Sequence, residues 1–193
     1  MADVVLFHHI QGLTTGLTDF AETLRSAGHT VHTPDLYDGR TFDSIQEGFG
    51  FATAEGHPDW DALADEAVAD LPAELVYVGF SSGVMRAQRL AQTRPGARGA
   101  VLIEACLPVT GEYAIGPWPE GVPVQVHGMD ADEFFAGDGD LAAAQELVAS
   151  TSDGELFVYE GDVHLFADSS LPAYDAEAAA LLTERVRAFL ARV

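Results

Sequence analysis

Three residue types in this 193-residue chain stand in an order and setting suited to acyl-transfer chemistry: a serine, an aspartate and a histidine. The serine, Ser81, lies in the pattern Gly79-Phe80-Ser81-Ser82-Gly83. A serine hydroxyl is a weak nucleophile near neutral pH unless a histidine takes its proton and a carboxylate orients that histidine. Ser81 is therefore our candidate nucleophile, and its partners must be sought further along the chain.

The setting of Ser81 strengthens this interpretation. The glycine pattern follows an apolar run at 75–78 and precedes a helical pattern at 83–92. A tight turn from strand to helix needs small residues two positions on either side of its serine, and it lifts the hydroxyl above the edge of the sheet. The backbone N–H of Ser82 would then bind half of an oxyanion. The Ser82 side chain is the rival nucleophile, although one position further along it is better suited to helix capping or to lining a pocket.

His164 is the predicted general base, because it is the last histidine of the chain and follows an apolar run at 156–159. The acid is less clearly marked. Asp132 is favoured, because two phenylalanines follow it and would bury its carboxylate beside the imidazole. Asp130, as a turn residue, and Asp138 remain alternatives.

The residues after the first apolar run should also border the site. In His8-His9-Ile10-Gln11-Gly12, the N–H of Ile10 is our candidate for the second oxyanion donor. Adjacent histidines on an extended chain point to opposite faces, so we expect one to pack and His9 to line the substrate pocket rather than both to bind a metal. Trp118, in a Pro/Gly-rich loop, would either form a wall of the acyl pocket or anchor its loop. We expect neither a metal nor a cofactor.

Short apolar runs alternate with helical patterns along the whole chain. We predict strands at 4–7, 30–33, 75–78, 99–105, 122–127 and 156–159. Helices are expected at 17–27, 44–54, 59–71, 83–92, 141–150 and 175–192. Strands separated by helix-length connections form a mostly parallel sheet of six or more strands with helices on both faces. We expect one such domain over residues 1–193.

The charge composition limits the partners. The chain holds 31 acidic and 9 basic residues for a net charge of −22, and every basic residue is arginine. Such a surface repels nucleic acid and anionic lipid. No apolar stretch reaches the length of about 18 residues that a membrane span requires, and the first residues lack the basic start of a signal peptide. We therefore expect a cytoplasmic protein, and the sole cysteine, Cys106, excludes an internal disulfide.

Together these motifs resemble the dienelactone hydrolase family of α/β-hydrolases along nearly the whole chain. The matching stretches are His8–Gly12, Thr33–Tyr37, Gly79–Gly83, Val124–His127 with Asp132–Phe134, and Gly161–Asp168. The resemblance implies an α/β-hydrolase fold, with Ser81 as nucleophile, Asp132 as acid and His164 as base.

The chain departs from the namesake enzymes at three positions. Their nucleophile is cysteine, where this chain has Ser81; the glutamate that contacts the thiol matches His9; and the arginine that holds the substrate carboxylate matches Asp168. The last change puts a negative charge where the family places a positive one. With the acidic composition, it predicts a neutral small-molecule ester or lactone rather than an anionic one.

The sequence thus predicts a hydrolase that cleaves a small carboxylic ester or lactone through an acyl-enzyme. Two alternatives use the same residues: a ligand-binding relative that has lost turnover, and a thioesterase or acyltransferase. Neither the identity of the substrate nor the oligomeric state follows from the sequence.

Overall fold

A single sheet of six strands, all parallel to their neighbours, forms the centre of the protein. A computed structural model describes residues 1–193 and gives the strand order β2-β1-β3-β4-β5-β6. The strands are β1 (Asp3–Phe7), β2 (Thr30–His32), β3 (Val76–Phe80), β4 (Gly99–Ile103), β5 (Val124–Met129) and β6 (Gly154–Tyr159). The predicted parallel sheet is confirmed.

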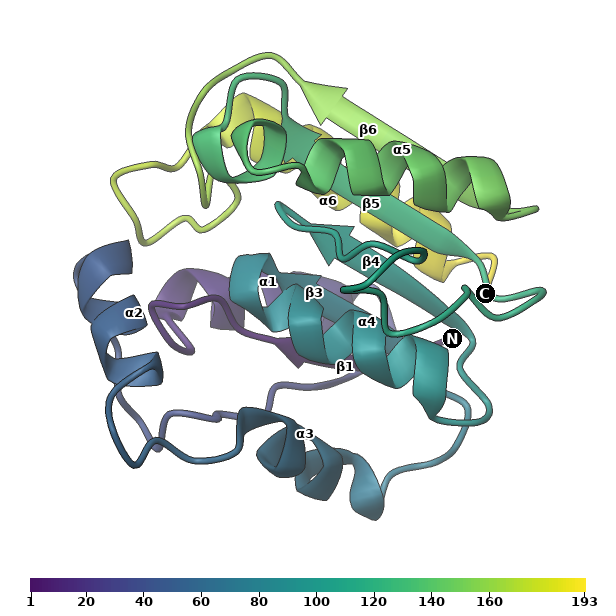
Figure 1. Ribbon diagram of the computed structural model, residues 1–193, viewed down its shortest axis with the longest axis horizontal. Helices are drawn as coiled ribbons and strands as arrows, with labels where there is room; N and C mark the ends of the chain where they lie inside the picture. Colours follow the sequence, from purple (N-terminus) through teal and green to yellow (C-terminus); the bar gives the residue numbers. More distant parts are fainter.

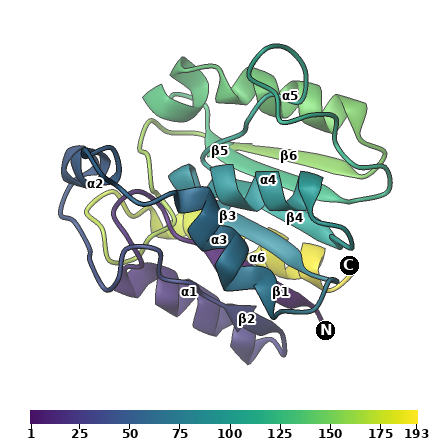
Figure 2. The same ribbon diagram turned by 60° about the horizontal axis from the view of Figure 1, so that its bottom comes forward.

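Helices cover both faces of this sheet. They are α1 (Thr15–Ser26), α2 (Ile45–Ala52), α3 (Trp60–Ala69), α4 (Val84–Thr93), α5 (Asp140–Ser150) and α6 (Ala176–Leu190). Figures 1 and 2 show α3, α4 and α5 on one face and α1 with α6 on the other, while α2 stands beside the end of the sheet where the strands finish. None of these helices has both the length and the apolar composition needed to cross a bilayer.

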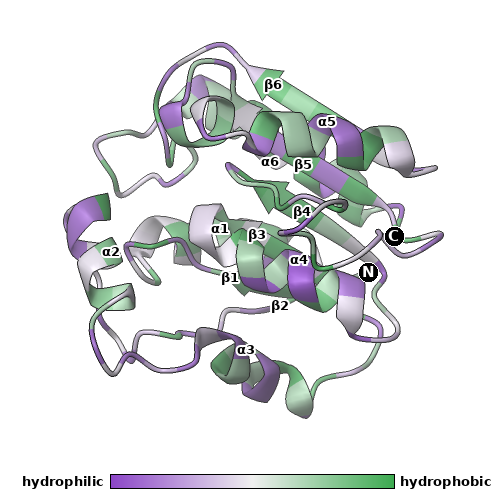
Figure 3. Ribbon diagram, in the orientation of Figure 1, coloured by the Kyte–Doolittle hydropathy of each residue, from purple (hydrophilic) through white to green (hydrophobic).

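The central strands β3 and β4 are apolar and buried on both sides, as strands covered by helices on both faces must be. Side chains alternate between faces along a strand, so Val76, Val78 and Phe80 of β3 pack in one core with α1 and α6. Tyr77, between them, packs in a second core with α3, α4 and α5. Figure 3 shows the hydrophobic colour concentrated in the central strands.

Side-chain caps set the beginnings of several helices. In each, a side-chain oxygen accepts a backbone N–H of the first turn and satisfies a donor that has no partner within the helix. The capping residues are Thr14 for α1, Ser44 for α2, Asp59 for α3 and Asp175 for α6. These short polar residues explain why the predicted helices begin within two residues of their observed starts.

The buried face of α3 differs from the predicted one. The amphipathic spacing of the sequence from 59 to 71 predicts a buried face made of Trp60, Leu63, Ala67 and Leu71. The structure buries Trp60, Ala64 and Val68 and leaves the neighbouring stripe half-buried. Both sets have helical spacing and begin at the same tryptophan, so periodicity alone could not choose between them.

Because all six strands are parallel, their carboxyl ends lie along one edge of the sheet. The chain segments that follow β1, β3, β4, β5 and β6 meet at this edge, and each predicted catalytic residue lies on one of them. In open parallel sheets this is the edge at which ligands bind.

Candidate active site

Ser81 is the first residue after β3 and adopts a left-handed backbone conformation, with φ of 47°. Such a conformation is strained for a residue with a side chain and is concentrated at functional sites. The two glycines of the motif are required by close packing. A Cβ on Gly79 would lie 2.6 Å from the nitrogen of Val84, and one on Gly83 would clash with the carbonyl oxygen of Phe7. The turn therefore presents Ser81 at the carboxyl edge and packs against the end of β1.

Ser81, His164 and Asp132 form a continuous chain of hydrogen bonds. The Ser81 hydroxyl lies 2.7 Å from Nε2 of His164, and Nδ1 of His164 lies 2.6 Å from Oδ2 of Asp132. A carboxylate can only accept, so Nδ1 carries the proton. Nε2 is then left to accept the proton of the Ser81 hydroxyl, which is the arrangement that general-base activation needs.

The sequence around Asp132 explains its position. The residue ends the loop after β5, is fully buried, and accepts the N–H of Phe134 at 2.9 Å on its other oxygen. A five-residue π-helical turn, Glu133–Gly137, follows it. The ring of Phe134 packs against the His164 imidazole with 4.7 Å between centroids, and Phe135 is fully buried. Phe134 thus covers one side of the imidazole, and Phe135 fills the core beside Gly128.

The other two candidate acids lie elsewhere. Asp130 is exposed and accepts the N–H of Gly161 at 3.0 Å, so it closes the loop between the ends of β5 and β6. Asp138 is exposed at the end of the π-helical turn. Of the three aspartates, only Asp132 contacts His164.

The surroundings of His164 favour its charged form. Burial alone would lower the pKa of this imidazole, but the hydrogen bond to Asp132 and the charges of Glu104, Asp132 and Asp140 raise the pKa above its ordinary value. The site can therefore stabilise the imidazolium that forms when a proton is taken from serine.

The two predicted oxyanion donors lie on segments in contact with each other. The Gly83 position packs against the carbonyl groups of Phe7 and His8, which places the loop containing Ile10 beside the turn containing Ser82. The N–H of Ile10 has no acceptor within the chain. The geometry is compatible with two N–H groups near the Ser81 hydroxyl.

His9 does not line the pocket, contrary to the sequence-based expectation. Its side chain is fully buried, with Nε2 2.8 Å from Oδ2 of Asp168 and Nδ1 accepting the N–H of Gln11 at 3.1 Å. His8 is also buried; it accepts the N–H of Leu36 and packs its ring against a tyrosine. Both histidines pack, because each finds polar partners in the interior.

Asp168 likewise does not face a substrate. It is 1% exposed and accepts hydrogen bonds from His9, Thr14 and both the N–H and hydroxyl of Ser170. Burial alone would raise the pKa of Asp168, but these hydrogen bonds lower the pKa to about 2. The inference that Asp168 repels an anionic substrate is therefore wrong, since its charge is fully engaged inside the protein.

Trp118 lies at the opposite edge of the sheet from Ser81. Its Nε1 donates to the carbonyl of Val122, just before β5 begins. The carbonyl of Gly116 accepts a bond from Gln92 near the end of α4, the helix whose start adjoins Ser81. Trp118 thus anchors its loop, and its expected place in the substrate pocket is wrong.

Glu104 is the residue that the sequence analysis missed. It follows β4, is 1% exposed, and bonds through Oε1 to the N–H of Phe166, two residues beyond His164. Burial raises the pKa of Glu104 to about 7, although the charge of His164 opposes this. One signal was available, because Glu104 is the only charged residue in the apolar run from 99 to 107.

Comparisons with known proteins identify the family and the fold. A family model described as the dienelactone hydrolase family matches residues 1–193. No curated protein matches the chain in a sequence search. Among solved structures, the dienelactone hydrolase-like promiscuous phosphotriesterase P91 from metagenomic libraries is 20% identical, with a TM-score of 0.74 and coverage of 100% of this chain and 86% of the other.

Esterase 2 of Thermogutta terrifontis, solved with butyrate bound, is 17% identical, with a TM-score of 0.70 and coverage of 100% and 83% of the two chains. At these identities the structural matches establish the α/β-hydrolase fold alone. The family model, which spans the whole sequence, establishes more: the chain belongs to the dienelactone hydrolase family of hydrolases.

Proposed function

We propose that this protein is a serine hydrolase that cleaves small carboxylic esters or lactones. The observation that carries the proposal is the continuous hydrogen-bond chain from Ser81 through His164 to Asp132. Family membership supports hydrolysis as the reaction class. The proposal goes beyond family membership in two respects: it names serine as the nucleophile and an ester as the bond that is cleaved.

In the proposed reaction, His164 takes the hydroxyl proton as the Ser81 oxygen attacks the substrate carbonyl. Asp132 holds the imidazole in the required tautomer and stabilises its cation. The backbone N–H groups of Ser82 and Ile10 bind the negative oxygen of the tetrahedral intermediate. His164 then protonates the leaving alcohol, and a water activated by the same histidine releases the acid and restores Ser81.

The charge around the site favours a neutral substrate. Three carboxyl groups, of Asp132, Glu104 and Asp140, act electrostatically on His164, and the whole chain carries a net charge of −22. The nearest arginine along α4, Arg86, is paired with Asp61. An anionic ester would approach against this field.

The test is turnover of p-nitrophenyl acetate and butyrate by the native protein and by Ser81→Ala. We expect Ser81→Ala to lose activity by about a thousandfold or more, with an unchanged circular dichroism spectrum. Ser82→Ala is the matched control, because it removes the neighbouring hydroxyl and keeps the backbone N–H; it should retain turnover. Equal activity in native protein and Ser81→Ala would exclude the proposed nucleophile.

The two alternative functions give different outcomes in the same assay. A ligand-binding relative without turnover would fold normally, hydrolyse no ester and leave a fluorophosphonate probe unattached to Ser81. A thioesterase or acyltransferase would label with the probe and prefer a thioester, or transfer the acyl group to an added alcohol. Comparing a neutral ester with one that bears a carboxylate tests the predicted charge preference.

A further inference from the structure

Glu104 and Ser81 leave neighbouring strands at the same level of the sheet. Strands β3 and β4 pair with Phe80 opposite Ile103, and each of these residues is followed by one with a left-handed backbone. The φ angles are 47° for Ser81 and 63° for Glu104. The two strained residues therefore stand side by side at the carboxyl edge, one carrying the candidate nucleophile and the other a carboxyl group.

The side chain of Glu104 is buried and only half satisfied. Oε1 accepts the N–H of Phe166 at 2.7 Å, whereas Oε2 is buried and has no hydrogen-bond partner. Burying a carboxyl oxygen without a partner costs free energy. Most buried polar groups in proteins are paired, so an orphaned oxygen beside a candidate active site requires an explanation.

The turn itself does not require a glutamate. The N–H of Glu104 donates to the carbonyl of His127 at 2.7 Å, a bond that any residue except proline can make. Glycine adopts positive φ without strain, and glutamate does so at a cost. A glutamate thus occupies this position although it brings backbone strain and an unpaired buried oxygen.

The position of Glu104 connects it to His164. The N–H that it accepts belongs to Phe166, on the loop that carries the histidine, and His164 and Asp132 are the charged groups that act on Glu104. In turn, the charges of Asp132, Glu104 and Asp140 raise the pKa of His164. Asp132 already accepts the Nδ1 proton, so Glu104 acts through the loop backbone and through its charge.

We propose that Glu104 is a positioning residue for His164. One carboxyl oxygen fixes the backbone just after the histidine, and the negative charge stabilises the imidazolium that forms when His164 takes the Ser81 proton. This inference rests on the proposed function for its role in turnover, but the electrostatic coupling of Glu104 to His164 is measurable without any substrate.

The first experiment is an NMR titration of the His164 imidazole, assigned with a His164→Gln protein, in the native chain and in Glu104→Gln. The amide keeps an oxygen for the Phe166 N–H and removes the charge. We expect the pKa of His164 to fall by about one pH unit. Glu160→Gln is the matched control, because it removes an equal charge from an exposed position on the loop that carries His164. This variant should leave the His164 pKa unchanged.

The second readout is the pH profile of kcat/KM for p-nitrophenyl acetate. In Glu104→Gln we expect the acidic limb to shift to lower pH by the same amount and kcat at pH 8 to fall about tenfold, with KM little changed. If the native protein hydrolyses no ester, the proposed function is refuted, and the NMR titration alone decides the role of Glu104. An unchanged His164 pKa would overturn the positioning role, whatever the activity.

Stability separates this role from a merely structural one. A carboxyl whose pKa is raised to about 7 on folding destabilises the native state as pH rises from about 4.5 through 7. Glu104→Gln should therefore have an equal or higher Tm than the native protein at pH 8. A variant that failed to fold would show that the fold requires the carboxylate, which overturns the proposal. Glu104→Asp, which keeps the charge, should keep the His164 pKa raised; a fall as large as that in Glu104→Gln would contradict the charge effect.

Discussion

At the scale of single residues, the protein contains a second histidine–aspartate pair that is structural. His9 and Asp168 are both buried, and the pair joins the loop after β1 to the loop that carries His164. Nδ1 of His9 accepts the N–H of Gln11, so the proton directed at Asp168 is on Nε2. The pair therefore holds Ile10 and His164 in fixed relation without contacting a substrate.

Asp168→Asn should destabilise the protein in a pH-dependent way. The folded pKa of Asp168, about 2, lies below the ordinary value of 3.8, so its stabilisation is present above pH 4 and is lost as pH falls toward 2. We expect a loss of about 2 kcal/mol at pH 7, measured by urea denaturation, that disappears near pH 2. Asp162→Asn, an exposed change on the same loop, is the control; an equal loss in both variants would contradict the role of the buried pair.

The sequence predicted the residues of the hydrogen-bond chain because each carries a local signature. The glycines around Ser81 mark its turn, and His164 is the last histidine. The partner of His9 lies 159 residues away, and no local pattern could identify it. The orphaned oxygen of Glu104 likewise depends on which strands are neighbours, which a single sequence does not state.

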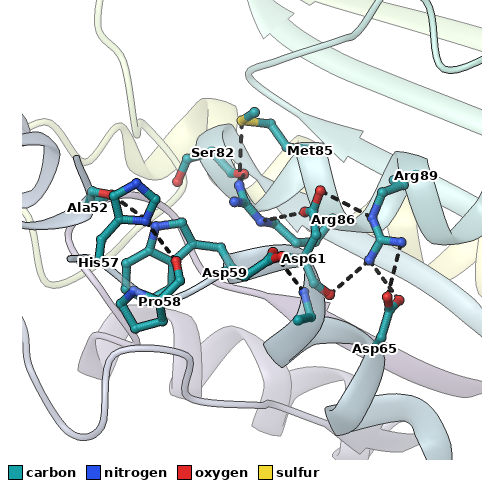
Figure 4. Close-up of polar contacts among 12 residues, drawn as sticks. Ala52, His57, Pro58, Asp59, Asp61, Asp65, Ser82, Met85, Arg86 and Arg89 are labelled. Atoms are coloured by element: carbon teal, nitrogen blue, oxygen red, sulfur yellow. Dashed lines mark hydrogen bonds and ion pairs between the residues drawn. The ribbon is translucent and has the colours of Figure 1, made fainter. Parts of the chain in front are cut away.

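At the scale of elements, arginines on α4 hold α3 in place. Figure 4 shows Asp61 of α3 between Arg86 and Arg89, with Asp65 one turn further along. Nε of Arg86 lies 3.2 Å from Asp61, and Nη2 of Arg89 lies 2.7 Å from Asp65. The Arg86 side chain is only 14% exposed, so Asp61 is the partner that offsets a mostly buried charge.

The two aspartates of α3 should therefore differ in importance. We expect Asp61→Asn to lower the free energy of unfolding by about 1 kcal/mol or more, because it leaves Arg86 without its carboxylate. Asp65→Asn removes an exposed ion pair and should cost about 0.5 kcal/mol or less. Urea denaturation in low salt measures both, and a larger effect of Asp65→Asn would contradict this ranking.

The elements themselves followed from the sequence because apolar runs and capping residues are local features. The strand order is not a local feature and could not be predicted in the same way. The predicted buried face of α3 was wrong because two apolar stripes of this helix share Trp60. The π-helical turn after Asp132 was also not predicted, since it depends on Phe135 entering the core beside Gly128. Tertiary packing decided each of these features.

At the scale of the whole molecule, 31 acidic residues against 9 basic ones make self-repulsion the dominant long-range electrostatic effect. The ion pairs described above are few by comparison, and most are partly exposed. Salt screens attraction and repulsion alike, with a Debye length near 10 Å at 0.1 M. Because repulsion is the larger of the two effects, added salt should stabilise the folded protein.

Raising NaCl from 0.05 to 0.5 M should therefore raise the Tm, by about 3 °C or more. The measurement is differential scanning calorimetry at pH 7.5. Sucrose at matched osmolality is the control, because it acts without screening charge. A Tm that falls with added NaCl would show that ion pairs, rather than repulsion, dominate the electrostatic energy of the fold.

The pairing of β3 with β4 divides the proposed machinery between two parts of the chain. Ile10 and Ser81 come before α4 in the sequence, whereas Glu104, Asp132 and His164 come after it. A nascent chain therefore carries its nucleophile for more than eighty residues of synthesis before the base exists. On the proposed mechanism, Ser81 would lack its base until the chain beyond β6 is in place, and neither of two fragments divided between α4 and β4 would hold the complete set of proposed catalytic residues.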